Sequence, residues 1–174
     1  MSHRIPNGAA RPTALQADFR RMMASVCTPV SVVTTMAGER PHGTTVSAFA
    51  SLSMAPPMVL VSLDRESELL EMVRRTGVFG LNVLSSTQSG LALAFARKGG
   101  ASKFADVSWD DDSGIPRLAG SAAFLVSDLA DVVDGGDHVV LLGSVRAVEH
   151  SERPPLTYHQ RTFGTHAALT DNPP

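Results

Sequence analysis

The sequence contains very little cysteine, since Cys27 is the single one among 174 residues. One thiol cannot close a disulfide within the chain, and this favours a reducing compartment, so we expect a cytoplasmic protein. Cys27 follows directly after a helical pattern. We therefore expect it to be buried as a small apolar residue.

Long hydrophobic runs and a charge of one sign are also absent. No apolar run approaches the ~20 residues that a helix needs to cross a bilayer, and the first residues lack the apolar centre of a signal peptide. The formal net charge of −2 gives no reason to expect nucleic acid or a membrane as a partner. With 43% hydrophobic residues, the chain can bury a core and fold as a globular protein.

The sequence lacks the common signatures of nucleotide, metal and hydrolase sites. It contains no G-x-G-x-x-G and no G-x-x-x-x-G-K, so Rossmann and P-loop nucleotide sites are not expected. Neither a G-x-S-x-G elbow nor an H-E-x-x-H motif is present. The six histidines show no metal-ligand spacing, so we expect no metal site.

The sequence contains one long segment with the apolar patterns of helices and strands, between two short ends that lack them. Residues 1–13 are rich in proline and glycine and are expected to form a flexible arm. Residues 14–168 are expected to form one domain, because neither a linker nor a repeat interrupts them. Residues 169–174 are expected to be a loose tail.

Three stretches have the apolar spacing that is typical of helices. The first covers residues 14–26, with one apolar face made by Leu15, Phe19, Met22, Met23 and Val26. The second covers residues 67–77, from a serine N-cap to a terminating glycine. The third continues to Phe95 from an N-cap that we expect at Thr87.

Runs rich in β-branched residues predict strands over residues 30–35, 42–47, 58–63, 78–84, 122–131 and 138–148. Residues 134–137 join the last two as a hairpin turn. Residues 109–120 are acidic and rich in turn formers, and we expect an irregular connection there. Because strands dominate and hairpins join neighbours, we expect a mainly β fold, an antiparallel barrel with peripheral helices.

Residues 43–57 place hydroxyl side chains on an otherwise apolar frame that ends at Pro56-Pro57. Small hydroxyls donate and accept hydrogen bonds without filling space. The stretch is therefore either one wall of a pocket for a flat ligand with polar edges, or a loop whose serines cap ordinary turns.

A basic cluster follows the third predicted helix, where Arg97 and Lys98 precede two glycines and then Ser102 and Lys103. Such a cluster can bind phosphate through charge-assisted hydrogen bonds. The alternative is a solvated helix end that the helix dipole stabilises.

His138 lies where a glycine turn enters a strand, directly after Asp137. A histidine in this place can face a pocket, and the adjacent carboxylate can fix its tautomer. The alternative is a turn aspartate beside a histidine that faces solvent.

In their order and spacing, these pieces resemble the short-chain flavin reductases, the reductase components of two-component flavin-dependent monooxygenases. The resemblance covers about residues 15–165. The matching segments are Pro29 to Thr35, Thr45 to Ser53, Pro56-Pro57, Phe79 to Leu84, Gln88, Phe95-Ala96, Lys103-Phe104, Gly114 to Pro116, Gly136 to His138 and Pro155 to Tyr158. The chain is especially similar to reductases of actinobacterial antibiotic pathways.

The resemblance implies an FMN-binding type of split β-barrel, antiparallel and Greek-key-like, that forms a homodimer. It implies reduction of FAD (or FMN) by hydride transfer from NADH (or NADPH). It also implies release of the reduced flavin to a flavin-dependent monooxygenase as partner. The sequence shows no clear arginine clamp for a 2′-phosphate, which favours NADH.

The resemblance assigns site residues by position. At the isoalloxazine it places Pro29, Val30, Thr45, Val46, Ser47, Ser51, Leu52 and Ser53. At the ribityl chain and phosphate it places Ser67, Asn82, Val83, Leu84, Ala96, Ser102, Lys103 and Phe104. Near the pyridine nucleotide it places His138, Tyr158, His159, Gln160 and Arg161. His138 is the catalytic residue in this scheme, because it orients the nicotinamide or stabilises charge on the reacting pair.

The sequence departs from the family pattern at two positions. Phe163 stands where members often have tyrosine, which puts a hydroxyl role there in doubt. Ser127 stands where many have cysteine, and we expect neutral packing.

Two other classes of function stay open. The chain can be a flavin-binding module without pyridine-nucleotide activity, which would not need His138 or the Tyr158 segment. It can also be an interaction subunit whose partner oxygenase carries out the chemistry, and reductase activity of the isolated protein would exclude that.

Overall fold

The protein is described here from a computed structural model, which covers residues 13–169. Residues 1–12 of the expected arm and residues 170–174 of the expected tail lie outside the described residues. Thr13 belongs to the first helix as its N-cap, since its hydroxyl accepts a hydrogen bond from the Gln16 backbone and the Gln16 side chain closes a capping box. Thr13 and Gln16 form the T-x-x-Q pattern of a capping box, which can be recognised from the sequence alone.

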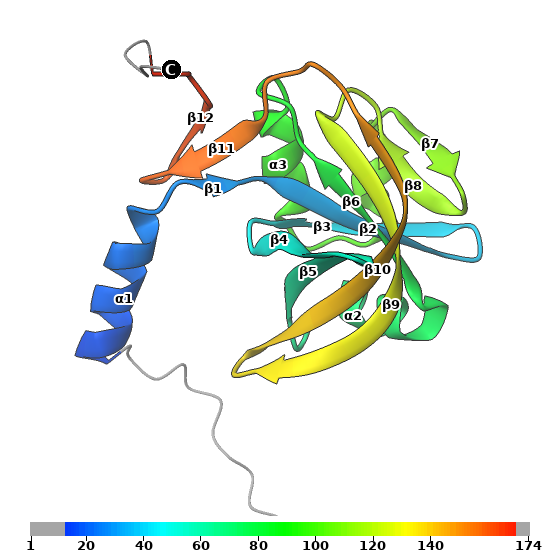
Figure 1. Cartoon of the computed structure of the whole chain (residues 1–174), viewed down its shortest axis with the longest axis horizontal. Helices are drawn as coiled ribbons and strands as arrows, with labels where there is room; N and C mark the ends of the chain where they lie inside the picture. Colours follow the sequence, from blue (N-terminus) through cyan, green and yellow to red (C-terminus); the bar gives the residue numbers. More distant parts are fainter. Residues whose placement is uncertain (1–12, 170–174) are drawn as a thin grey trace, which may run out of the picture.

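The secondary structure is mostly strand (Figure 1). The helices are α1 (Ala14–Ala24), α2 (Glu68–Thr76) and α3 (Ser89–Phe95), with a 3₁₀ turn η1 (Ala101–Phe104). The strands are β1 (Thr28–Pro29), β2 (Ser31–Ala37), β3 (Arg40–Val46), β4 (Phe49–Met54), β5 (Pro57–Asp64), β6 (Val78–Val83), β7 (Trp109–Asp112), β8 (Ile115–Leu118), β9 (Ala123–Gly135), β10 (His138–His150), β11 (Leu156–His159) and β12 (Thr162–Thr165). Within residues 13–169, none of the helices has the length and apolar character needed to cross a membrane.

Seven strands form one antiparallel sheet in the order β3-β2-β6-β9-β10-β5-β4. The sheet curls into a barrel, and its two edge strands follow one another in sequence through residues 47–48 (Figure 1). The corner is held because the Ser62 backbone N–H donates to the Ala48 carbonyl at 2.8 Å. This arrangement confirms the expected mainly β, antiparallel split barrel.

The main core lies inside this barrel. Along β5, Val59, Val61 and Leu63 alternate inward at 0–4% exposure, as period-2 patterning requires. The apolar side of α2 packs on the same core through Leu69, Leu70 and Val73. Strand β10 crosses this core closely at Gly143, where a Cβ would lie 2.5 Å from the Phe79 ring, so that only glycine fits.

Residues 109–120 form the β7–β8 hairpin, so the expected irregular connection was wrong. The buried Asn82 side chain holds this hairpin on the barrel. Its Nδ2 donates to Thr34 Oγ1 at 3.1 Å and to the Pro116 carbonyl at 3.3 Å, while its Oδ1 accepts from the Leu118 backbone at 2.8 Å. Sequence patterning missed the hairpin because the contacts that define it come from a distant strand.

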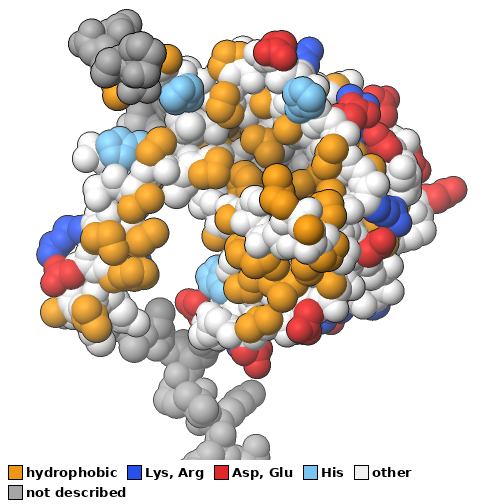
Figure 2. Space-filling view, viewed as in Figure 1, with side chains coloured by type: hydrophobic (Ala, Val, Ile, Leu, Met, Phe, Trp, Pro, Cys, Tyr) orange, Lys and Arg blue, Asp and Glu red, His pale blue; other side chains and the backbone are white. Residues whose placement is uncertain are grey.

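Strands β1, β11 and β12 form a small separate sheet that carries α1. Helix and hairpin are joined because the Gln160 backbone donates to the Ala24 carbonyl at 2.8 Å, and His159 Nε2 lies 3.1 Å from the Ser25 carbonyl. The helix stands away from the barrel and leaves a hollow between the two (Figures 1 and 2). The hairpin contacts the barrel core through Leu156, which is buried beside Val30 and Phe95.

One expectation about the start of the chain is confirmed and one needs correction. The predicted helix is present and ends at Ala24, and none of its residues is buried, with Phe19 59% exposed. Cys27 is exposed, so the expectation of a buried thiol was wrong. Helix α1 is attached to the β11–β12 hairpin by the hydrogen bonds at its C-terminal end and contributes no buried residue.

Two helix caps also differ from expectation. The N-cap of α3 is Gln88, and the hydroxyl of Thr87 lies 3.2 Å from that of Ser85 instead. Ser67 does occupy the N-cap of α2, but its side chain makes no capping hydrogen bond.

Candidate functional site

Two adjoining pockets open on one side of the barrel, between β3, β5 and the residues that precede α2. We call the first the Thr45 pocket, a cavity of about 240 Å³ lined by Thr44 to Ala48, Ser62 to Asp64, Ser67 and His138. We call the second the Lys103 pocket, a cavity of about 520 Å³ lined by His42, Thr44, Asp64, Glu66, Ser67, Glu68, Ala96 to Gly100 and Lys103. The two share Thr44, Asp64 and Ser67, so they form neighbouring parts of one site.

The hydroxyl-rich stretch contributes its first half to this site. Thr45 Oγ1 donates to the Ala92 carbonyl at 2.7 Å, so this hydroxyl holds α3 against β3. Ser47 is exposed at the barrel corner and lines the Thr45 pocket. Ser51, Leu52 and Ser53 lie on β4 and line neither pocket.

The N-terminus of α2 borders both pockets through Ser67. The approach to the helix is shaped by Asp64, whose carboxylate accepts a hydrogen bond from the Glu66 backbone at 2.8 Å. No side chain caps the first turn of this nine-residue helix. Its first N–H groups, at the positive end of the helix dipole, are therefore suited to an anionic ligand group.

Lys103 is anchored to the barrel rather than extended into solvent. Its Nζ donates to the carbonyls of Gly43 at 3.1 Å and Phe95 at 3.0 Å. Burial lowers the pKa of Lys103 below its usual value, which the nearby Glu68 carboxylate partly offsets. An ammonium has three donors, so one remains for a ligand in the pocket.

The neighbours of Lys103 divide between core and surface. Phe104 is buried and packs edge-on against Phe95, with ring centroids 4.9 Å apart, so its contacts are with the protein interior. Ser102 is exposed, and its hydroxyl donates to the Gly99 carbonyl at 2.9 Å. Ala96 lines the Lys103 pocket.

His42 and Glu68 both line the Lys103 pocket, and sequence analysis did not single out either residue. Glu68 Oε2 lies 3.3 Å from His42 Nε2, and its Oε1 lies 3.3 Å from Arg40 Nη2. Burial lowers the pKa of His42, against the opposing effect of Glu68. The pairing of β3 with α2 was needed to see this group, because the residues are far apart in sequence.

His138 stands at the mouth of the Thr45 pocket. It is the first residue of β10 and lies opposite Asp64 in the ladder with β5. Its Nδ1 lies 2.8 Å from Asp137 Oδ1, and this hydrogen bond lowers the pKa of the Asp137 carboxyl. A carboxylate can only accept here, so neutral His138 carries its hydrogen on Nδ1 and presents Nε2 as an acceptor.

Several predicted site residues lie elsewhere in this chain. Asn82 and Leu84 are completely buried, and the polar atoms of the Asn82 side chain hold β7–β8, so a contact of Asn82 with the flavin stays a prediction. Val83 is half-buried in β6. Val30 is buried in the core beside α3, next to the exposed Pro29.

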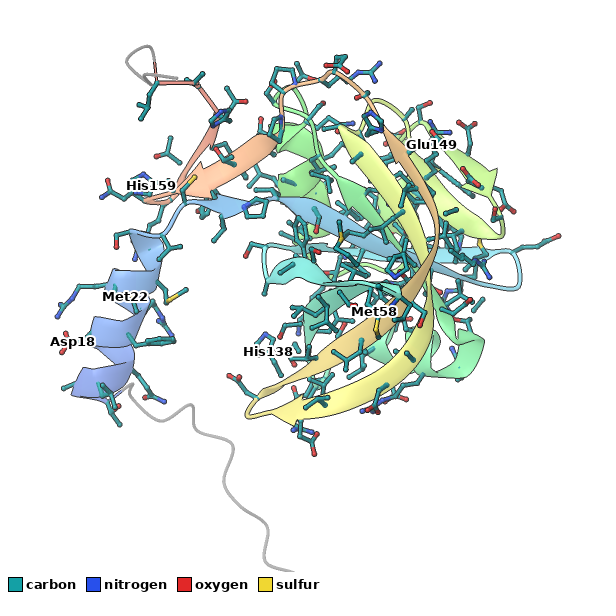
Figure 3. All side chains as sticks on the ribbon, viewed as in Figure 1. Asp18, Met22, Met58, His138, Glu149 and His159 are labelled. Atoms are coloured by element: carbon teal, nitrogen blue, oxygen red, sulfur yellow. The ribbon has the colours of Figure 1, made fainter. Side chains whose placement is uncertain are left out.

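The predicted pyridine-nucleotide segment and His138 are separated within one chain. Tyr158 and His159 lie on β11, and Gln160 and Arg161 form the turn to β12. Figure 3 shows His159 beside the top of α1 and His138 on the side of the barrel that faces this helix. The Tyr158 ring packs on Phe163, at a centroid distance of 5.0 Å.

No group of three or more His, Cys, Asp or Glu side chains within residues 13–169 is arranged to hold a metal ion. The polar side chains of the two pockets are small hydroxyls, three cations, two histidines and three carboxylates, namely Thr44, Thr45, Ser47, Ser62, Ser67, Arg97, Lys98, Lys103, His42, His138, Asp64, Glu66 and Glu68. This set suits a ligand with a hydrogen-bonding edge and an anionic end.

The chain is similar to known proteins in both sequence and structure. Residues 23–167 match the family described as flavin reductase like domain. The chain belongs to this family. It is 35% identical over 149 residues to the reductase component of 4-nitrophenol 4-monooxygenase/4-nitrocatechol 2-monooxygenase of Rhodococcus opacus, covering 86% of this chain and 80% of that protein.

Two further proteins are similar to this member of the flavin reductase-like family. The FMN reductase (NADH) SmoA of Agrobacterium fabrum is 35% identical over 148 residues, covering 84% of each chain. The solved structure of the Streptomyces globisporus C-1027 NADH:FAD oxidoreductase SgcE6 in complex with NAD and FAD fragments superposes with a TM-score of 0.83. It is 28% identical and covers 89% of this chain and 94% of that one. The resemblance drawn from the sequence motifs is thereby confirmed.

Proposed function

We propose that this protein reduces FAD or FMN with NADH and releases the reduced flavin to a separate monooxygenase. The observation that carries the proposal is the pair of adjoining pockets, with His138 at one end and Lys103 at the other, in a chain of this family. The names of its relatives support the chemistry, since they include an NADH-dependent FMN reductase, an NADH:FAD oxidoreductase and a monooxygenase reductase component.

The flavin supplies the redox chemistry when it is bound, and the protein positions the reactants. The backbone of Thr45, Val46 and Ser47 would bond the polar edge of the ring system in the Thr45 pocket. The uncapped first turn of α2 and the free donor of Lys103 would bind the phosphate in the Lys103 pocket. The remaining predicted contacts of Ser51 to Ser53 and of Ser102 lie outside both pockets and stay predictions.

His138 would orient the nicotinamide over the Thr45 pocket. Hydride transfer needs the two reacting atoms at about 3–3.5 Å, so the main requirement is placement. The Nε2 acceptor of His138, fixed by the bond to Asp137, suits the carboxamide N–H of a nicotinamide. A protein base is not required for this step.

We further propose that the protein works as a homodimer. The apolar face of α1 is exposed together with Val26, which follows the helix, and Leu15, Phe19, Met22, Met23 and Val26 are between 42% and 78% accessible. A second copy would cover this face and could bring its Tyr158 to Arg161 segment to the His138 of the first copy. His138 and the Tyr158 to Arg161 segment, which lie apart within one chain, would then bind the same pyridine nucleotide across the dimer.

Anaerobic mixing tests the proposed function most directly. The purified protein is mixed with excess FAD or FMN and with NADH or NADPH, and bleaching of the oxidised flavin is followed. We expect many turnovers with NADH, and the four combinations rank the partners. Bound flavin without bleaching would favour the non-catalytic flavin-binding module, and the absence of both bleaching and binding would reject a flavin function.

The cellular setting is a proposal as well. A reductase in an antibiotic pathway, located in the cytoplasm, remains our prediction, and the similarity to a Streptomyces protein is what supports it. Among the described residues the chain has no membrane-spanning helix.

A further inference from the structure

We infer that Arg65 is a positioning residue that fixes His138 against the residues leading into α2. This inference rests on the proposed function, in which His138 faces the pyridine nucleotide. Arg65 lines neither the Thr45 pocket nor the Lys103 pocket, so it acts only through the residues that it holds.

Arg65 holds the β9–β10 turn through three of its groups. Its backbone N–H donates to the Asp137 carbonyl at 3.1 Å. Its Nε donates to the Gly136 carbonyl at 2.7 Å, and its Nη2 lies 2.8 Å from Asp134 Oδ1. One planar guanidinium therefore binds a carbonyl and a carboxylate of the same turn, a fork geometry that lysine cannot reproduce.

Asp64 and Ser67, which flank Arg65 in the sequence, line the Thr45 pocket together with His138. Asp64 pairs with His138 in the ladder between β5 and β10. The Asp64 carbonyl accepts from the Ser67 backbone at 3.1 Å, and its carboxylate accepts from the Glu66 backbone. Arg65 therefore connects the turn that carries His138 to the N-terminus of α2.

The turn needs this support because it extends beyond the sheet. Strand β5 ends at Asp64, the partner of His138, so beyond this pair residues 134–137 have no strand partner outside their own hairpin and are held by Arg65, which follows β5. The Asp137 side chain is 94% exposed, yet it must stay 2.8 Å from His138 Nδ1 to fix the tautomer. The charged groups around His138 are Asp137 in the turn, Asp64 on β5, and the Arg65–Asp134 pair. Loss of Arg65 would let the turn move and weaken the Asp137–His138 bond.

The test compares Arg65→Gln with Arg74→Gln. Arg74 is a matched control, since it is a similarly exposed arginine paired with Glu71 at 4.0 Å on the far end of α2. We expect Arg65→Gln to raise the KM for NADH about fivefold, the size of one lost network contact. The flavin Kd and the kcat at saturating NADH should stay within about twofold, because the Lys103 pocket is untouched. Arg65→Lys, which keeps the charge, should fall between wild type and Arg65→Gln.

A spectroscopic measurement tests the positioning itself, without reference to activity. The ¹⁵N shifts of the His138 ring at about pH 8, where an ordinary imidazole is neutral, report which nitrogen carries the hydrogen. We expect the wild type and Arg74→Gln to carry it on Nδ1, and Arg65→Gln to show a mixture of both tautomers. His138→Ala identifies the resonances.

The outcomes separate the two proposals. Unchanged His138 tautomer signals in Arg65→Gln would overturn the positioning role, whatever the enzyme does. A changed KM with an equal change in the flavin Kd would also overturn it, because the effect would then be a general loss of structure. If the wild type reduces no flavin, the proposed function fails, and the ring shifts still decide the role of Arg65.

Discussion

The Nε2 atom of His42 lies 3.3 Å from Oε2 of Glu68, while Nδ1 of the same ring is buried without a hydrogen-bond partner among the described residues. The residue is only 5% exposed. Burial is the main reason that the pKa of His42 falls below its ordinary value of 6.5, and the charges of Lys103 and Arg40 add to the effect. The folded protein therefore favours the neutral form of His42 over the protonated form.

This geometry predicts a loss of stability in mild acid. Because the folded pKa of His42 lies below the unfolded value of 6.5, the unfolded chain takes up the proton first as the pH falls. The contribution of His42 to the free energy of unfolding is complete above the unfolded pKa and declines as the pH falls toward the folded pKa. Urea unfolding at pH 7.5 and pH 5.5 measures it. The decline should be smaller in His42→Gln, and an equal decline in both proteins would contradict the assignment.

His138→Ala should weaken the use of NADH while flavin binding survives. The imidazole lines the Thr45 pocket and is not among the residues that line the Lys103 pocket. Flavin titration and steady-state rates at varied NADH separate the two effects. His150→Ala, at the opposite end of β10, is the control and should behave like the wild type. Unchanged turnover in His138→Ala would remove this residue from the site.

Lys103→Ala should affect both stability and flavin affinity. Removal of the ammonium takes a donor from the Gly43 carbonyl and leaves the Phe95 carbonyl with only the Thr44 hydroxyl at 3.5 Å, at a cost of about 1–3 kcal/mol in the free energy of unfolding. Loss of a charge-assisted phosphate contact should weaken flavin binding by about 1–3 kcal/mol. Lys98→Ala, in the same pocket, should change stability by less than about 0.5 kcal/mol. If flavin affinity stays constant in Lys103→Ala, the lysine serves only to hold the barrel.

Ser127 and Ser31 give a matched pair of buried hydroxyls. Ser127 Oγ is buried without a partner among residues 13–169, whereas Ser31 Oγ donates to the Val46 carbonyl at 2.8 Å. Ser127→Ala should therefore leave the free energy of unfolding unchanged or raise it by about 1 kcal/mol, and Ser31→Ala should lower it by about 1 kcal/mol. Thermal or urea unfolding measures both. The reverse order would show that Ser127 has a partner, such as an ordered water molecule.

Changes on α1 should test the proposed dimer. Phe19→Ser and Met22→Ser together remove large apolar side chains from the exposed face and should shift the protein toward monomer in sedimentation equilibrium. Arg20→Ser, on the polar side of the same helix, should leave the assembly unchanged. The barrel should stay folded, because α1 contributes no buried residue to it. A double variant that remains fully dimeric would place the interface elsewhere.

Local patterns predicted most of the fold. The alternation in β5, the apolar face of α2 with Gly77 at its left-handed C-cap, and the glycine turn before His138 each depend on residues close in sequence. Their order also carried the family resemblance. The β7–β8 hairpin was missed because it is stabilised by Asn82 from another strand, which no local pattern records.

The sequence by itself determined the helices and the strands β2, β3, β5, β6, β9 and β10, since these follow from the period of apolar residues and from the turn residues between them. The family followed from the resemblance of its ordered motifs. Only the tertiary structure showed that Asn82 holds a hairpin, that Glu68 meets His42, that Arg65 holds the turn before His138, and that α1 stands apart with Cys27 exposed. The physical reason is that burial and hydrogen bonding depend on which distant segments meet, and the curling of one sheet decides that.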